Sequence, residues 1–213
     1  FIPTEDGDSI GVFPVLPEHA VVVRPEVPIT LGIGRSVSLY GAVPLYLSVR
    51  VVQSSEYSQP VRGGFADIGT ALLDVPVHTL SQTWFGGPMT GRLCVRCDVP
   101  LSYQPVMQID PLAFAVCPLR VRNITRKPVE IGALAIPTEQ LRLFRRVKDK
   151  DNFGFWTTSV SAIYTGDEEL HLSVVDRKPG VSDLLEPWMP PRVSATDHLF
   201  HRGMILLRNI TNS

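Results

Sequence analysis

The stretch that decides the fold class is Val43-Pro44-Leu45-Tyr46-Leu47-Ser48-Val49-Arg50-Val51, in which every odd position is apolar and the even positions are mixed. Side chains of a β-strand point alternately to its two faces, so a period of two indicates a strand with one apolar face. The pattern therefore predicts a single half-buried strand over 43–51, with the five odd-numbered side chains on one face.

The same alternation recurs along the rest of the chain. It covers 129–135 after Pro128, and it returns over 156–164, where Thr165-Gly166-Asp167 predicts a tight turn into another alternating run over 170–174. Short aliphatic runs at 19–23, 29–33 and 204–207 are bounded by Pro or Gly. In all, about a dozen strands are expected, with turn signals roughly every 8–12 residues, as in a β-sandwich or barrel.

Helical signals are scarce, and the 19 prolines limit helix length further because each removes an amide donor. Residues 137–141 could form a short helix, although Leu141 and Leu143 also fit a strand, and 182–186 could form one turn. We therefore expect an all-β fold, an antiparallel β-sandwich with helix limited to single turns.

Domain boundaries are weakly marked. Residues 103–111, with Pro105 and Pro111, are the best linker candidate, and they predict two β-sandwich lobes over 1–104 and 105–213. The alternative is one elaborated sandwich over 1–213, since a β-sandwich of this length can be a single unit. Two further irregular stretches, 53–69 and 176–198, are long enough to suggest functional loops or a lid.

Charge and composition exclude several classes of partner. Lys and Arg number 20 against 21 Asp and Glu, so the chain lacks the basic excess that favours binding to nucleic acid or anionic lipid. No run of about 18 apolar residues predicts a membrane-spanning helix. Gly32-Ile33-Gly34 lacks the third glycine and the helix of a dinucleotide fingerprint, and no cofactor is predicted.

The three cysteines are predicted to be free thiols that bind no metal. In Cys94-Val95-Arg96-Cys97 the flanking residues alternate like a strand, so the two sulfurs should point to opposite faces, with Cys97 toward the core and Cys94 beside Arg92 and Arg96. A second pair, which a zinc ribbon needs, is missing. His198 and His201 could chelate a metal on a helix, but their context favours loop histidines. A reduced, cytoplasmic protein fits this cysteine usage best.

The candidate ligand-binding residues are aromatic and basic side chains. Trp84 and Trp188 lie in Gly- or Pro-rich stretches where an exposed indole could stack on a sugar ring or a partner, although packing beneath a loop is more common. Arg142, Arg145 and Arg146 belong to a basic cluster that could grip phosphate or simply be a solvated strand edge.

No combination of nucleophile, base and orienting group stands out, so no catalytic residue is predicted. The expected function is a non-enzymatic binding or structural module that recognises a protein partner or a second copy of itself, through end loops or an exposed sheet edge. The alternative is a carbohydrate-binding or carbohydrate-modifying β-protein that uses Trp84 or Trp188.

Three segments together suggest a family. They are Ser38-Leu39-Tyr40-Gly41-Ala42-Val43-Pro44-Leu45-Tyr46-Leu47-Ser48-Val49, Trp84-Phe85-Gly86-Gly87-Pro88-Met89-Thr90-Gly91-Arg92-Leu93-Cys94, and Val121-Arg122-Asn123-Ile124-Thr125-Arg126-Lys127-Pro128-Val129-Glu130-Ile131. In that order the chain resembles an uncharacterised domain-of-unknown-function family of archaeal and bacterial β-proteins. The resemblance implies an intracellular all-β protein and brings no site residues with it. The third segment is also similar to a hairpin of immunoglobulin-like modules.

A four-residue repeat, Arg122-Asn123-Ile124-Thr125 and Arg208-Asn209-Ile210-Thr211, follows an apolar run each time. Asn tolerates turn geometry and can bond its own backbone two residues on, so both Asn residues are predicted at strand ends. After the first copy, residues 129–131 are expected to return as the second strand of a hairpin. Neither Asn is expected to carry a glycan.

Overall fold

The computed structural model describes residues 2–3, 8–52, 69–89, 91–105, 110–146, 154–166, 169–175, 178–179, 185–193 and 205–209. Its strands are β1 (Ile2–Pro3), β2 (Ser9–Val15), β3 (Val21–Val23), β4 (Ile29–Leu31), β5 (Ser36–Pro44), β6 (Tyr46–Val52), β7 (Thr70–Pro76), β8 (Gln82–Phe85), β9 (Arg92–Arg96), β10 (Phe114–Asn123), β11 (Val129–Ile136), β12 (Leu143–Arg146), β13 (Phe155–Thr157), β14 (Ser159–Gly166), β15 (Glu169–Val175), β16 (Leu185–Met189) and β17 (Ile205–Asn209). The helical structure in these ranges is one 3-10 turn, Thr138–Gln140. The all-β prediction is confirmed.

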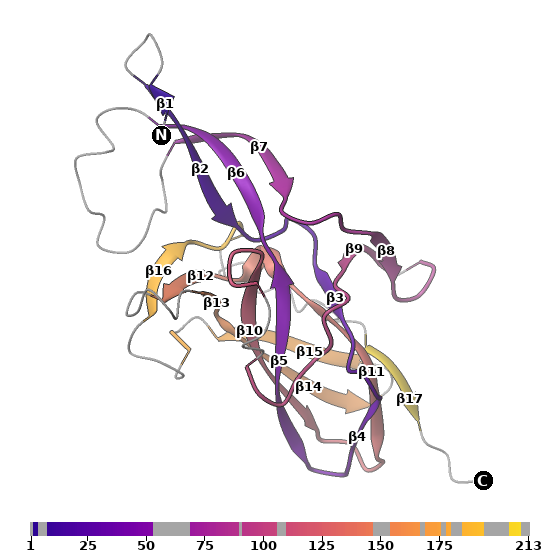
Figure 1. Cartoon of the computed structure of the whole chain (residues 1–213). Helices are drawn as coiled ribbons and strands as arrows, with labels where there is room; N and C mark the ends of the chain where they lie inside the picture. Colours follow the sequence, from indigo (N-terminus) through magenta and orange to yellow (C-terminus); the bar gives the residue numbers. More distant parts are fainter. Residues whose placement is uncertain are drawn as a thin grey trace.

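The strands form three sheets (Figure 1). A seven-stranded sheet has the order β15-β14-β10-β13-β12-β16, with β5 also paired to β10. A six-stranded sheet has the order β17-β11-β3-β9-β8, with β4 paired to β11, and a four-stranded sheet has the order β1-β2-β6-β7. Pairing is mostly antiparallel, but β10 pairs in parallel with β13 and β14, and β3 with β9.

The main core lies between the inward faces of the two larger sheets. Leu39, Leu119 and Val121 come from the seven-stranded sheet, and Val21 and Ile131 from the six-stranded sheet, and all belong to one buried cluster. A fully buried side chain of this kind contributes about 1.5–3 kcal/mol relative to an exposed one. Burial of these two apolar faces is therefore the main force that holds the sheets together.

The longest ladder of the fold joins β5 and β10, from Phe114 opposite Pro44 to Arg122 opposite Ser36. Gly41 lies in the middle of this ladder, where a Cβ atom would be 3.0 Å from Ile136 Cδ1 of the facing sheet. A glycine at this position therefore lets the two sheets approach closely.

Several pairings connect the two halves of the chain. β5 pairs with β10 and β3 pairs with β11, so both larger sheets contain strands from before and after residue 105. These pairings favour the alternative of one unit over 1–213 rather than lobes over 1–104 and 105–213, and the single domain stays a prediction.

The strand expected over 43–51 is two strands. β5 ends at Pro44 and β6 begins at Tyr46, and the two belong to different sheets. Val43 and Leu45 are fully buried in the core, whereas Leu47 is exposed. The alternation of apolar residues continues without a break because it has the same phase in both strands. At Leu45, however, the chain passes from the seven-stranded sheet to the four-stranded sheet.

The hairpin expected after Asn123 is also wrong, because β10 and β11 pair with other strands and lie in different sheets. The prediction that both Asn residues end strands is confirmed for Asn123 on β10 and Asn209 on β17. Asn123 is fully buried. Its amide group donates to the carbonyls of Leu31 (3.1 Å), Gly32 (3.2 Å) and Lys127 (2.8 Å), and its oxygen accepts from the Thr125 N–H (2.9 Å) and hydroxyl (2.8 Å). One side chain thus joins the connection after β4 to the turn that leads from one sheet to the other.

Other local predictions have mixed outcomes. The chain reversal expected after β14 agrees with the antiparallel pairing of β14 and β15, in which Gly166, at φ 107°, lies opposite Glu169; Asp167 lies outside the described ranges. The short helix expected within 137–141 is the 3-10 turn Thr138–Gln140, and Leu143 begins a strand. Leu185 and Glu186, expected in a helical turn, begin β16 because they pair with Arg146 and Arg145 of β12. Most of 53–69, and part of each of 103–111 and 176–198, lies outside the described ranges.

Replacing Asn123 with Ala should destabilise the fold, because the carbonyls of Leu31, Gly32 and Lys127 lose the Asn123 donor and the Thr125 N–H loses its acceptor. We expect a loss of about 2–4 kcal/mol in the free energy of unfolding, measured by urea denaturation. Ile124→Ala is the matched control, since Ile124 is the adjacent exposed residue. Equal losses in the two variants would contradict the role assigned to the Asn123 side chain.

Candidate functional site

The four-stranded sheet exposes an apolar face. In its register Val12 of β2 lies beside Val49 of β6 and Leu73 of β7, and the next row consists of Pro14, Leu47 and Val75. Residues directly opposite one another on paired strands share a face of the sheet, so these six residues form one surface, called here the apolar face. The exposed fractions are largest at Leu73 (59%), Val12 (57%) and Val75 (43%).

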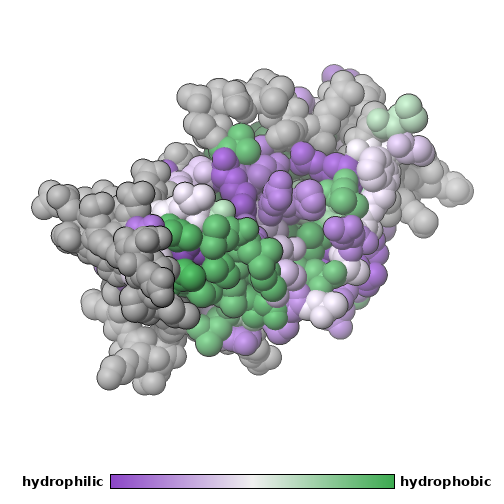
Figure 2. Space-filling view, turned by 90° about the horizontal axis from the view of Figure 1, so that it is seen from above, coloured by the Kyte–Doolittle hydropathy of each residue, from purple (hydrophilic) through white to green (hydrophobic). Residues whose placement is uncertain are grey.

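Figure 2, which looks down on the end of the molecule where this sheet lies, shows hydrophobic residues gathered into a continuous patch. Scattered single apolar residues are normal on protein surfaces, but contiguous apolar patches mark interaction sites. The apolar face is therefore the first candidate for a functional surface.

The polar residues of this sheet face the protein instead. Ser48 is fully buried, and Asp74 and Arg50 are partly buried. The Arg50 Nε donates to the Ser48 hydroxyl at 3.2 Å. The usual arrangement of an antiparallel sheet, apolar inward and polar outward, is thus partly reversed.

Asp74 and Arg192 tie the sheet to the segment after β16. The Arg192 guanidinium forms an ion pair with Asp74 and donates to the Leu16 carbonyl at 2.8 Å. Burial raises the pKa of the Asp74 carboxyl, but hydrogen bonds from Ser48 and Arg192 outweigh it and hold that pKa below its usual value. A pocket of about 190 Å³ lies beside Arg192, with walls from Leu16, Leu141 and Met189.

Strand β7 is an edge of the sheet, and within the described ranges it pairs only with β6 (Figure 1). All of its residues except the half-buried Asp74 are exposed. Natural edge strands are commonly protected by charges, especially lysine, yet Asp74 is the only charge in Thr70–Pro76 and points inward to Arg192. The alternation of the sequence does not predict this strand, because Ala71-Leu72-Leu73 interrupts it; the signal that could have indicated the strand is the apolar run with one charge.

The two predicted tryptophans lie far apart, Trp84 on β8 and Trp188 on β16, at opposite sides of Figure 1. Trp84 is 55% exposed, and its Nε1 donates to the Gly87 carbonyl at 3.2 Å. Gly91 lies under the ring, since a Cβ there would be 2.2 Å from Nε1. Trp188 is partly buried against the core and donates from Nε1 to the Pro14 carbonyl at 3.1 Å.

The predicted arginines lie on or beside β12, and the structure brings one of them to Trp188. The Arg145 guanidinium lies 4.8 Å from the centre of the Trp188 ring and 3.7 Å from the Glu186 carboxylate. Arg142 precedes β12, and its backbone N–H donates to the Thr158 hydroxyl at 3.1 Å. Arg146 bonds through its backbone to the Gly154 carbonyl at 2.9 Å. Through these contacts residues 142–146 are bonded to neighbouring segments of the seven-stranded sheet.

All three cysteines are free thiols, as predicted. Cys94 and Cys97 do point to opposite sides, but Cys94 does not lie on a solvated face: it is buried in a second, smaller cluster with Val22, Phe85 and Ala133. Burial raises the pKa of each thiol, most at Cys117, where it reaches about 12. A thiol with a raised pKa is protonated at neutral pH and is a poor nucleophile.

No group of three or more His, Cys, Asp or Glu that could hold a metal ion occurs in the part of the chain that the structure describes. His198 and His201 lie outside that part.

Among the described segments, no helix has the length and apolar character needed to cross a membrane.

The fold and its surface define an all-β protein of packed sheets that carries an exposed apolar sheet face. The chain belongs to the family described as protein of unknown function (DUF432), whose profile matches residues 1–206. This confirms the resemblance to an uncharacterised family. Comparison with curated proteins and with solved structures found no match.

Stability should depend on pH through Asp74. The folded-state pKa of Asp74 lies below its ordinary unfolded value near 3.9. Its stabilising contribution is therefore complete above that value and is lost as the pH falls through the lower, folded-state pKa. We expect Asp74→Asn to lower the free energy of unfolding by about 1 kcal/mol at pH 7, and the difference from the parent protein to shrink below about pH 4.

The matched control is Asp98→Asn, which removes the more exposed ion pair between Asp98 and Arg96. Denaturant unfolding over a series of pH values measures both variants. A loss for Asp74→Asn that is independent of pH, or an equal loss for Asp98→Asn, would contradict the assignment.

Proposed function

We propose that this chain is a non-enzymatic interaction module that assembles with a second copy of itself through the edge of β7 and the adjoining apolar face. The observation that carries the proposal is the apolar outer side of the four-stranded sheet. Its inner side holds Ser48 and the half-buried Asp74–Arg192 pair beside Phe13 and Val15 of the core, while valine and leucine face outward. Exposing this much aliphatic surface has a free-energy cost that assembly would recover.

The size of the surface favours pairing of strands over simple face-to-face contact. Three strands of this length cover an area of about 14 Å by 24 Å, or roughly 300 Å², in projection. A stable interface buries about 800 Å² on each partner. The apolar face alone is too small, and backbone hydrogen bonds along β7 would supply the rest, as they do when a strand is added to a sheet edge.

A second copy is the occupant that the charges favour. An edge strand that pairs antiparallel with its own copy forms a symmetric contact. Both subunits then use the same surface patch, and each contact between two residues occurs twice. The single charge on β7, Asp74, is already neutralised by Arg192. Two copies would therefore meet without repulsion between like charges, and the whole chain has a net charge of only −1.

The non-enzymatic part of the proposal is supported by the cysteine thiols, whose raised pKa values oppose a nucleophilic role. A cytoplasmic location stays a prediction, and the free thiols agree with it.

Leu73→Lys should weaken assembly about tenfold or more, because it places a charge in the middle of the interface. Sedimentation equilibrium over a wide range of concentrations measures the dissociation constant. Val27→Lys is the matched control, since Val27 is 72% exposed outside the four-stranded sheet. Because Leu73 is itself exposed, thermal unfolding should show a stability change within about 0.5 kcal/mol for both variants.

A parent protein that stays monomeric at the highest soluble concentration would overturn the proposal. Equal weakening by Leu73→Lys and Val27→Lys would overturn the assigned surface.

A second candidate function, carbohydrate binding, is favoured by one observation at Trp84. Its exposed ring is held by the Gly87 carbonyl and rests on Gly91, so the indole presents a fixed flat surface. A preformed aromatic surface of this kind suits a sugar ring, because it loses little freedom on binding. Trp188 is less suited, since its ring already contacts Arg145 and its Nε1 is bonded to Pro14.

If Trp84 binds a saccharide, a glycan array should give a signal that Trp84→Ala abolishes. Met89→Ala is the matched control, since Met89 is 94% exposed shortly after β8. Gly91→Ala should also weaken the signal, because its Cβ would displace the indole without removing it. A signal unchanged in Trp84→Ala, or none across the array, would exclude this candidate.

A further inference from the structure

A row of polar residues crosses the outer face of the seven-stranded sheet. Ser38 of β5 lies directly opposite Arg120 of β10, and Arg120 lies opposite Ser161 of β14. The row continues to Ser173 of β15. Side chains directly opposite on paired strands have Cβ atoms about 4.5–5.5 Å apart, so two hydroxyl groups flank the base of the Arg120 side chain.

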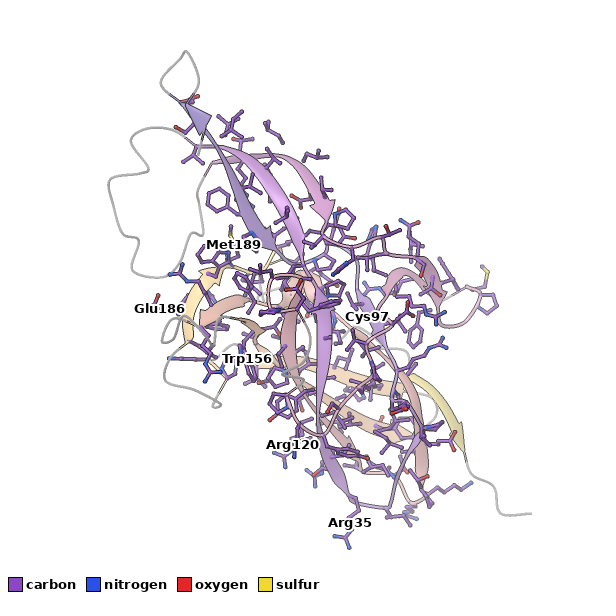
Figure 3. The ribbon with its side chains drawn as sticks, in the orientation of Figure 1. Arg35, Cys97, Arg120, Trp156, Glu186 and Met189 are labelled. Carbon is purple, nitrogen blue, oxygen red and sulfur yellow. The ribbon has the colours of Figure 1, made fainter. Side chains whose placement is uncertain are left out.

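Arg120 differs from the arginines that stabilise the fold. Arg92, Arg96, Arg145 and Arg192 each form an ion pair with a carboxylate. Across the ranges that the structure describes, no ion pair involves the exposed Arg120. Figure 3 shows Arg120 toward the same end of the molecule as Arg35, away from Glu186. The positive charge of Arg120 is thus available to a ligand.

A pocket of about 320 Å³ opens at this row. Its walls include Ser38, Tyr40, Arg120, Ser159, Ser161 and Lys178, so hydroxyl and cationic groups converge on one space. Among the described residues that line it there is no carboxylate. A pocket that offers several donors and positive charge suits an anionic group with several oxygen acceptors.

Two features of the pocket favour a phosphorylated organic molecule over a carboxylate and over a bare phosphate ion. Hydroxyl donors on both sides of a guanidinium match the several oxygens of a phosphate group better than the two oxygens of a carboxylate. Tyr40 and Pro118 add apolar surface to the walls. The Tyr40 ring is supported by Trp156 in an edge-to-face contact, with ring centres 6.3 Å apart.

We propose that this pocket binds the phosphate group of a small phosphomonoester. The Arg120 guanidinium holds the phosphate oxygens, the Ser38 and Ser161 hydroxyls donate to them, and the organic part lies against Tyr40 and Pro118. The site shares no residue with the β7 interface, so either proposal can fail without the other.

The test is a titration of the full chain, followed by NMR chemical shifts, with phenyl phosphate, glucose 6-phosphate, inorganic phosphate, phenol and glucose. At least one of the two phosphomonoesters should give saturable shifts, whereas phenol and glucose should give none. Inorganic phosphate should bind more weakly than the better phosphomonoester, because it lacks the part that contacts Tyr40 and Pro118.

Arg120→Gln should weaken binding about tenfold or more, and Ser38→Ala and Ser161→Ala each about threefold. Arg122→Gln is the matched control: Arg122 is the next exposed outward residue of β10 and does not line the pocket. Its effect should be clearly smaller, within about twofold, because Arg122 makes no direct contact with a phosphate in the pocket.

Three results would overturn the proposal. They are the absence of saturable shifts with both phosphomonoesters, an equal loss of affinity in Arg120→Gln and Arg122→Gln, and equal affinity for inorganic phosphate, which would assign the pocket to the free ion. Because Arg120 is exposed, thermal unfolding should be the same for the parent and both arginine variants.

Discussion

The pairing of β5 with β10 is the constraint on which the rest of the structure depends. It joins strands that are far apart in the chain, and its inward side chains, among them Leu39 and Leu119, supply one wall of the core. Gly41 within it lets Ile136 of the opposite sheet approach. Where β5 leaves this sheet at Pro44, the chain continues directly as β6, so the same ladder also fixes where the four-stranded sheet begins.

The four-stranded sheet is held by few but specific contacts. The apolar outer side of this sheet contributes nothing to the core. The sheet is therefore held in place by the buried ends of β2 and β6 and by polar contacts from β16 and the segment after it. Arg192 bonds to Leu16 and Asp74, and Trp188 bonds to Pro14. These side chains act as positioning residues for the exposed surface, which explains why Trp188 is a poor candidate for ligand stacking.

The two candidate surfaces have opposite chemistry and lie on different sheets. The apolar face can recognise only another apolar surface or an extended strand, whereas the pocket around Arg120 offers cationic and hydroxyl donors. Arg145 pairs with Glu186 and so links neighbouring strands of one sheet. Arg120, for which the described residues offer no ion pair, lines the pocket instead.

The sequence by itself determined that the chain is all-β, because a period of two in side-chain polarity is local and survives in any arrangement of strands. It also placed the ends of β10 and β17 at Asn123 and Asn209, since turn chemistry is local as well. Only the tertiary structure decided which strands pair and which face is covered. Leu45 and Leu47 have the same place in the sequence pattern, yet one is fully buried and the other exposed, because alternation separates two faces without saying which one a second sheet will cover. For the same reason the row of Ser38, Arg120 and Ser161 was invisible in the sequence: residues so far apart along the chain become neighbours only through strand register.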